Sequence, residues 1–148
     1  MTAIAPPNLK GAFWLALLLN LLWINASEVF RYFAFVMPLM RSSLPQIQDV
    51  APMNLPVFMI WGVWDTVLVL AATGLSWVLL ERFGPTIRNA LYAGSVIWAT
   101  IFVILWLGLW NMNLATTQVV LTTLPLAWLE MIVSALIVRW MMVRGCLD

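Results

Sequence analysis

Four long apolar stretches dominate this chain, at residues 11–37, 57–80, 90–110 and 119–143. A helix rises about 1.5 Å per residue, so roughly 20 residues cross the hydrocarbon of a bilayer, and each stretch is long enough. Backbone groups in lipid must bond within their own segment, which favours helices. The sequence therefore predicts an all-α polytopic membrane protein, with residues 1–148 forming one four-helix transmembrane domain.

The composition supports this class and excludes others. Hydrophobic residues make up 64% of the chain and charged residues 9%, whereas soluble domains are near half apolar and a quarter charged. The net charge is +1 and the basic residues are scattered, so we expect no nucleic-acid partner. With no histidine and only Cys146, the chain has neither an internal disulfide nor a His/Cys metal site, and we expect no metal and no cofactor.

The breaks between the stretches contain prolines, glycine and polar residues. The first break is the longest and is predicted to begin at Pro38, because proline disfavours a continuous helix. The second contains Gly84 and Pro85, and the third covers residues 111–118. Short connections of this kind predict that sequential helices are antiparallel neighbours.

The distribution of basic residues predicts the orientation in the membrane. Cytoplasmic ends of membrane helices carry an excess of Lys and Arg. If the N-terminus is cytoplasmic, the opposite side holds only Arg41, and the inner side collects Lys10, Arg82, Arg88, Arg139 and Arg144. We therefore predict that both termini are cytoplasmic and that the protein is integral to a bacterial inner (plasma) membrane.

An alternative interpretation takes residues 1–26 as a cleaved signal peptide. Lys10 precedes an apolar run, and Ala26 resembles the end of a weak cleavage site. The apolar pattern continues to Met37, however, and secretory apolar regions are shorter than this whole stretch. The length of this apolar stretch favours a membrane span that remains in the mature protein over a cleaved signal peptide.

Three carboxylates, Glu28, Asp65 and Glu130, interrupt three of the apolar stretches. Near the predicted outer side, Glu28 lies nine residues before Met37, Asp65 nine after Pro56 and Glu130 nine after Leu121, about 13 Å at helical rise. Acids in hydrocarbon are costly, and they usually face one another, a cation or water. We therefore predict that the three side chains converge in the outer half of the bundle.

Neighbouring polar residues extend this predicted cluster. Arg31 follows Glu28 by three positions, a spacing that permits an ion pair on one helix, and Asn25 and Tyr32 share the same stripe. One Arg against three acids leaves a surplus of two negative charges if all ionise. Protons, a bound cation, a basic ligand or a partner's basic residue are the candidates for compensation. The alternative is a structural role, in which the acids only hold helices together.

Aromatic residues accompany the acids. Trp61 and Trp64 lie close to Asp65, and Trp128 lies two residues before Glu130. Aromatic faces beside carboxylates can hold an organic cation or a flat apolar ligand. Many of the ten tryptophans also fit an interfacial belt. At the outer end of the third span, the amide of Asn111 is placed to join the rim of the cluster.

Two families share features with the chain. The four spans and Glu28 in the first resemble small multidrug-resistance transporters, in which such a carboxylate exchanges protons for cationic drugs; this chain differs by two further acids and a longer first loop. The chain also resembles the EXPERA group of sterol and amphiphile binders, with Glu28, Asp65, Trp61 and Trp128 as residues of matching type. No signature string is shared with either family.

These features predict a membrane protein that binds a small apolar or cationic ligand, as a transporter or receptor component. The first alternative is an accessory subunit of a larger membrane complex, in which Arg31, Glu28 and Glu130 pair across an interface. A homo-oligomer is a further alternative.

A third hypothesis is an intramembrane enzyme with Glu28 and Asp65 as acid and base. The sequence assigns no catalytic residue, and we expect the protein not to be an enzyme. Besides such partners, the lipid bilayer is the expected environment.

Overall fold

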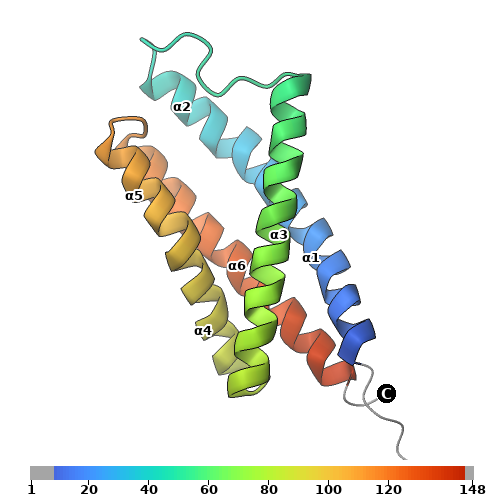
Figure 1. The fold of residues 1–148 in the computed structure, drawn as a ribbon. Coiled ribbons are helices and arrows are strands. Elements are labelled where there is room, and N and C mark those ends of the chain that lie inside the picture. Colours follow the sequence, from blue (N-terminus) through green and yellow to red (C-terminus); the bar gives the residue numbers. More distant parts are fainter. Residues whose placement is uncertain (1–8, 146–148) are drawn as a thin grey trace, which may run out of the picture.

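The computed structural model describes residues 9–145, and Cys146 lies outside this range. Four long antiparallel helices make up the fold, and no strand occurs between residues 9 and 145 (Figure 1). All four are long and apolar enough to cross a membrane, which confirms the predicted all-α class. The elements are α1 (Leu9–Arg31), the π-helical turn η1 (Tyr32–Val36), α2 (Met37–Ser43), α3 (Leu55–Phe83), α4 (Ile87–Trp98), the π-helical turn η2 (Ala99–Val103), α5 (Ile104–Asn111) and α6 (Thr117–Gly145).

The first helix is longer than predicted. It runs without a break from α1 through η1 and α2, so Pro38 lies inside it and the first connection is residues 44–54. The prediction that this connection begins at Pro38 was wrong. Proline lacks an amide hydrogen and its ring crowds the carbonyl four residues earlier. The π-helical turn directly before α2 has wider i→i+5 bonding, which accommodates a residue that cannot donate.

The other helix ends follow the local sequence. The Asn54 side chain accepts a hydrogen bond from the amide of Val57 at 3.1 Å and caps the start of α3. Gly84 ends this helix with a φ of 92°, a conformation that glycine adopts without strain. Thr86 then caps α4 by accepting from the amide of Asn89 at 3.2 Å. The predicted second connection is therefore confirmed.

Helix α6 is the centre of the bundle and packs against α1, α3, α4 and α5. Gly94 brings α4 very close to α6, because a Cβ atom at that position would lie 2.7 Å from the carbonyl oxygen of Met131. Helix α3 packs on α4, but none of its Cα atoms lies within 8 Å of a Cα atom in η2 or α5. Figure 1 shows α3 and α5 leaning apart toward the end that carries the 44–54 loop.

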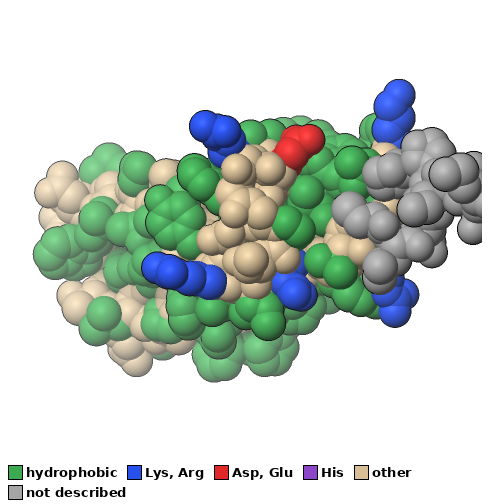
Figure 2. Space-filling model, turned by 90° about the horizontal axis from the view of Figure 1, so that it is seen from below, with side chains coloured by type: hydrophobic (Ala, Val, Ile, Leu, Met, Phe, Trp, Pro, Cys, Tyr) green, Lys and Arg blue, Asp and Glu red, His purple; other side chains and the backbone are tan. Residues whose placement is uncertain are grey.

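The two ends of the bundle differ. The start of α1 and the end of α6 lie together at one end, here called the termini end, and the 44–54 loop lies at the other, the loop end (Figure 1). Figure 2 looks onto the termini end, where Lys and Arg side chains surround an apolar surface with little acid. Between the ends, large apolar side chains are exposed on all four long helices, as expected for a surface in contact with lipid.

Candidate functional site

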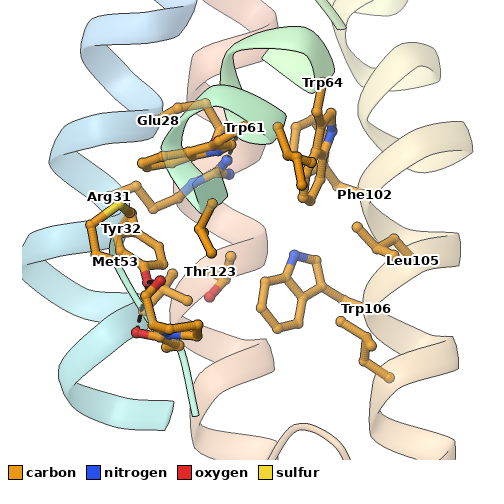
Figure 3. A pocket seen from close by; sticks show the side chains of 16 residues that line it. Glu28, Arg31, Tyr32, Met53, Trp61, Trp64, Phe102, Leu105, Trp106 and Thr123 are labelled. Atoms are coloured by element: carbon orange, nitrogen blue, oxygen red, sulfur yellow. Dashed lines mark hydrogen bonds and ion pairs between the residues drawn. The ribbon is translucent and has the colours of Figure 1, made fainter. Parts of the chain in front are cut away.

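A cavity of about 470 Å³ lies near the loop end, between all four long helices. The 44–54 loop completes its wall. Figure 3 shows the charged and hydroxyl side chains on one side of the cavity and aromatic and aliphatic side chains of η2 and α5 on the other. The lining residues are Glu28, Arg31, Tyr32, Val36, Ala51, Pro52, Met53, Val57, Ile60, Trp61, Trp64, Phe102, Leu105, Trp106, Leu109 and Thr123.

The cavity exists because of the helix arrangement. Near its start, α3 has no Cα atom within 8 Å of η2 or α5, and the space between them is lined from α3 by Val57, Ile60, Trp61 and Trp64. Both π-helical turns border this space, η1 with Tyr32 and η2 with Phe102. A π-helical turn shifts the faces that the following helix presents, and such turns recur at functional sites.

An ion pair forms the charged part of the wall. Glu28 and Arg31 lie one turn apart on α1, and Nη2 of Arg31 donates a hydrogen bond to Oε1 of Glu28, which confirms the predicted pair. The same Nη2 is 3.8 Å from Oε2 of Glu130 on α6. The guanidinium carbon also lies 5.0 Å from the centre of the Phe102 ring, within range of a cation–π contact. Arg31 is only 4% exposed, so these contacts replace solvent.

Glu130 lies behind the ion pair and is buried, with 1% of the residue exposed. The hydroxyl of Ser27 donates to its Oε2 at 2.7 Å, and the Trp23 indole donates to its main-chain carbonyl at 3.0 Å. Its other oxygen, Oε1, has no hydrogen-bond partner within residues 9–145. The carboxylate therefore links α1 to α6 and retains one unused acceptor.

Asp65 completes the cluster. It is 4% exposed and lies within electrostatic range of Glu28 and Arg31, and Glu130 interacts with all three of these residues. Arg31 is thus paired with Glu28, 3.8 Å from Glu130 and within electrostatic range of Asp65. Only Glu28 among the three acids lines the cavity, whereas Asp65 and Glu130 lie outside its lining.

Three aromatic residues predicted for the site also line the cavity, namely Tyr32, Trp61 and Trp64. The rings of Tyr32 and Trp61 pack against each other, with centroids 4.9 Å apart. The Tyr32 hydroxyl donates to the carbonyl of Ala51 at 3.0 Å, which ties the first helix to the loop.

The structure does not bring the other three predicted residues to the cavity. Asn25 donates to the carbonyl of Leu21 on its own helix at 2.8 Å. Trp128 donates to Ser95 at 3.0 Å on the opposite side of α6, and Asn111 is exposed at the end of α5. None of the three lines the cavity. Helical spacing gives the angle between residues of one helix, but not the face that meets the other helices.

Other cavity residues were missing from the sequence-based prediction. Phe102 and Trp106 are four residues apart on the third span, and this aromatic spacing was a usable signal. Thr123 gave no signal, because nothing in its neighbourhood distinguishes it from other residues of the fourth span. Ser27 was likewise not predicted as a partner of Glu130, since it lies on a different face of α1 from Asn25 and Tyr32.

A second polar layer lies closer to the termini end. The buried Asn20 amide donates to the hydroxyl of Thr73 at 3.0 Å and to the carbonyl of Ser134 at 3.4 Å, so it joins α1, α3 and α6. Within residues 9–145, Oδ1 of Asn20 and the hydroxyls of Ser76 and Ser134 have no partner. Side chains of this kind commonly bond membrane helices to one another.

The cavity thus combines the Glu28–Arg31 ion pair with five aromatic side chains. Such a site suits an apolar molecule with a positive group, because attraction between a cation and a ring strengthens when water is excluded.

Neither a protein-family profile, nor a curated protein, nor a solved structure matches this chain.

Proposed function

We propose that this chain is an integral membrane protein that binds a small, largely apolar ligand with a cationic group in the cavity beside Glu28. The observation that carries the proposal is the cavity itself, which borders all four long helices near the loop end. Its volume of about 470 Å³ lies within the ~300–1,000 Å³ typical of ligand sites. Binding as part of a transporter or a receptor is consistent with this geometry.

The residues of the wall favour a cation over an anion. Trp61, Trp64, Trp106, Tyr32 and Phe102 supply the aromatic faces. Glu28 is the one acid among the lining residues, and its ion-pair partner Arg31, which also lines the cavity, is close to Glu130 as well. With Asp65 nearby, three acids share one guanidinium, and if all three are ionised, a positive group beside Glu28 compensates part of their surplus negative charge.

The accessory-subunit hypothesis required Arg31, Glu28 and Glu130 to pair across an interface. Within this chain the three side chains already lie beside one another. This internal pairing supports a role for the chain's own cavity. Constant co-purification of other subunits in mild detergent is the result that would favour the accessory role.

The charge distribution supports an orientation with the cavity in the outer half of a bacterial inner membrane. Five basic residues belong to the termini end and one to the loop end, and cytoplasmic ends carry the excess of Lys and Arg. Both ends of the chain are then cytoplasmic. The 44–54 loop then faces the external side.

Tetraphenylphosphonium and tetraphenylborate provide a matched test, because they have nearly the same shape and opposite charge. Thermal unfolding of the purified protein in mild detergent is measured with each ion. We expect the cation to raise the unfolding temperature in a saturable way, and the anion to have a much smaller effect. Equal shifts with both ions would contradict a charge-selective site.

Two variants locate the binding. Glu28→Gln is expected to weaken cation binding about tenfold or more, the equivalent of roughly 1.4 kcal/mol, because it removes the carboxylate of the wall. Trp128→Phe is the control, since Trp128 contacts Ser95 outside the cavity and its replacement leaves binding unchanged. Normal binding by Glu28→Gln would reject this site.

A further inference from the structure

We infer that the ligand reaches the cavity from the lipid, through the space between α3 and α5. This inference rests on the proposed function and narrows it, because it restricts the ligands to molecules that dissolve in a bilayer. Three observations carry it: a gap in helix packing, the exposure of residues that line the cavity, and the closure of the loop end.

The first observation is the packing of α3. Its Cα atoms approach within 8 Å of Cα atoms in α1, α4 and α6, but not of those in η2 or α5. Residues on both sides of this backbone gap, among them Trp64 on α3 and Leu105 on α5, line the same cavity (Figure 3). The cavity therefore extends to a place where only side chains separate it from the outer surface.

The second observation is that residues of the lining also belong to the outer surface. Ile60 is 70% exposed, Trp64 54% and Leu105 38%. At helical rise, Trp64 lies about 14 Å from the start of α3 and Leu105 about 9 Å from the end of α5. These exposed apolar side chains are thus at a depth where acyl chains surround the protein.

The third observation is the covering of the loop end. Ala51, Pro52 and Met53 form part of the cavity wall there. The carbonyl of Ala51 accepts hydrogen bonds from the Tyr32 hydroxyl at 3.0 Å and from Nη2 of Arg41 at 3.2 Å. The loop is thus fixed to both η1 and α2, and it covers the side of the cavity that is nearest to water.

A lipid route makes a kinetic prediction. A ligand that arrives from the bilayer binds at a rate set by its concentration in the lipid, whereas a ligand that passes the loop binds at a rate set by its concentration in water. The chemical class that fits is an amphiphilic cation, with an apolar body that partitions into lipid and a positive group for Glu28.

The test uses the protein in nanodiscs and a series of alkyltriphenylphosphonium ions with increasing chain length. Association is followed by stopped-flow tryptophan fluorescence, and the free aqueous concentration and the partition coefficient of each probe are measured separately. We expect the association rate constant, expressed per free aqueous concentration, to rise with the partition coefficient along the series. A rate constant that stays the same for all chain lengths would overturn the inference.

Substitutions test the route itself. Leu105→Trp and, on the facing helix, Ile60→Trp are each expected to slow association and dissociation severalfold, because a larger side chain narrows the gap. Leu121→Trp is the control for added bulk, since Leu121 is exposed on α6 and does not line the cavity. Arg41→Gln loosens the loop and is expected to leave both rates unchanged.

The outcomes separate the two proposals. Faster binding by Arg41→Gln with unchanged rates in both tryptophan variants would show passage beside the loop and would overturn the lipid route alone. Absence of binding at equilibrium by the unmodified protein would reject the proposed function and this inference with it.

Discussion

Arg31 is the residue on which the acid cluster depends. It lies 4% exposed beside Glu28 and Glu130, and Asp65 is within its electrostatic range. Removal of one partner from a buried ion pair is costly because it leaves the other charge without compensation. The structure therefore makes this one guanidinium the common counter-ion of acids from three helices.

Arg31→Met is accordingly expected to destabilise the protein by about 3–5 kcal/mol, the usual cost of breaking a buried pair. Thermal or denaturant-induced unfolding in detergent measures the change. Arg82→Met is the matched control, because Arg82 is exposed at the termini end and surface substitutions usually stay within ~0.5 kcal/mol. If Arg31→Met is as stable as Arg82→Met, the charged cluster does not hold the helices together.

Among the elements, α4 and α6 approach each other closely at Gly94. A Cβ at Gly94 would lie 2.7 Å from the carbonyl oxygen of Met131 and 2.9 Å from Cα of Ile132. Both are backbone atoms, so no side-chain rotation relieves the clash. The small residue lets the two helices meet here, while α3 and α5 remain apart on the other side of the bundle.

Gly94→Ala is expected to destabilise the protein by roughly 1–3 kcal/mol, because the two helices must separate to admit the methyl group. Gly108→Ala on α5 is the comparison, since a Cβ at that position would meet nothing within 4 Å and alanine favours a helix by up to ~1 kcal/mol. Unfolding midpoints of the two variants provide the measurement. Equal midpoints would contradict the tight contact.

At the scale of the whole molecule, the two ends of the bundle differ in charge and in the presence of the cavity. The termini end carries most of the basic residues, and the loop end contains the cavity of about 470 Å³. The proposed orientation places the loop end outside. It also determines from which leaflet a ligand of the proposed class is taken.

Single cysteines in a Cys146→Ser background test this orientation. We expect Gln46→Cys, in the 44–54 loop, to react with a membrane-impermeant maleimide in intact cells, and Thr86→Cys, in the second connection, to react only after permeabilisation. We expect this pattern because the positive charges at the termini end favour a cytoplasmic location of that end. The reverse pattern of labelling would invert the proposed orientation.

Parts of the site could be predicted because they depend on spacing within one helix. The Glu28–Arg31 pair follows from a separation of three residues, and the common depth of the acids follows from helical rise. The prediction for Pro38 was wrong because a π-helical turn, which depends on local bonding geometry, carries the helix past it. Asn25 and Trp128 were misplaced because apolar residues surround each helix and leave its rotation undefined.

The sequence by itself determined that the chain forms four membrane-length helices, because long apolar stretches leave the backbone no other way to satisfy its hydrogen bonds in lipid. From helical rise it also predicted that acids from three of them lie at one depth. Only the tertiary structure decided that Glu28 alone among the acids reaches the cavity and that Ser27 and Phe102 join the cluster. Those relations depend on how each helix is rotated and tilted against its neighbours, which is set by side-chain packing between segments far apart in the chain.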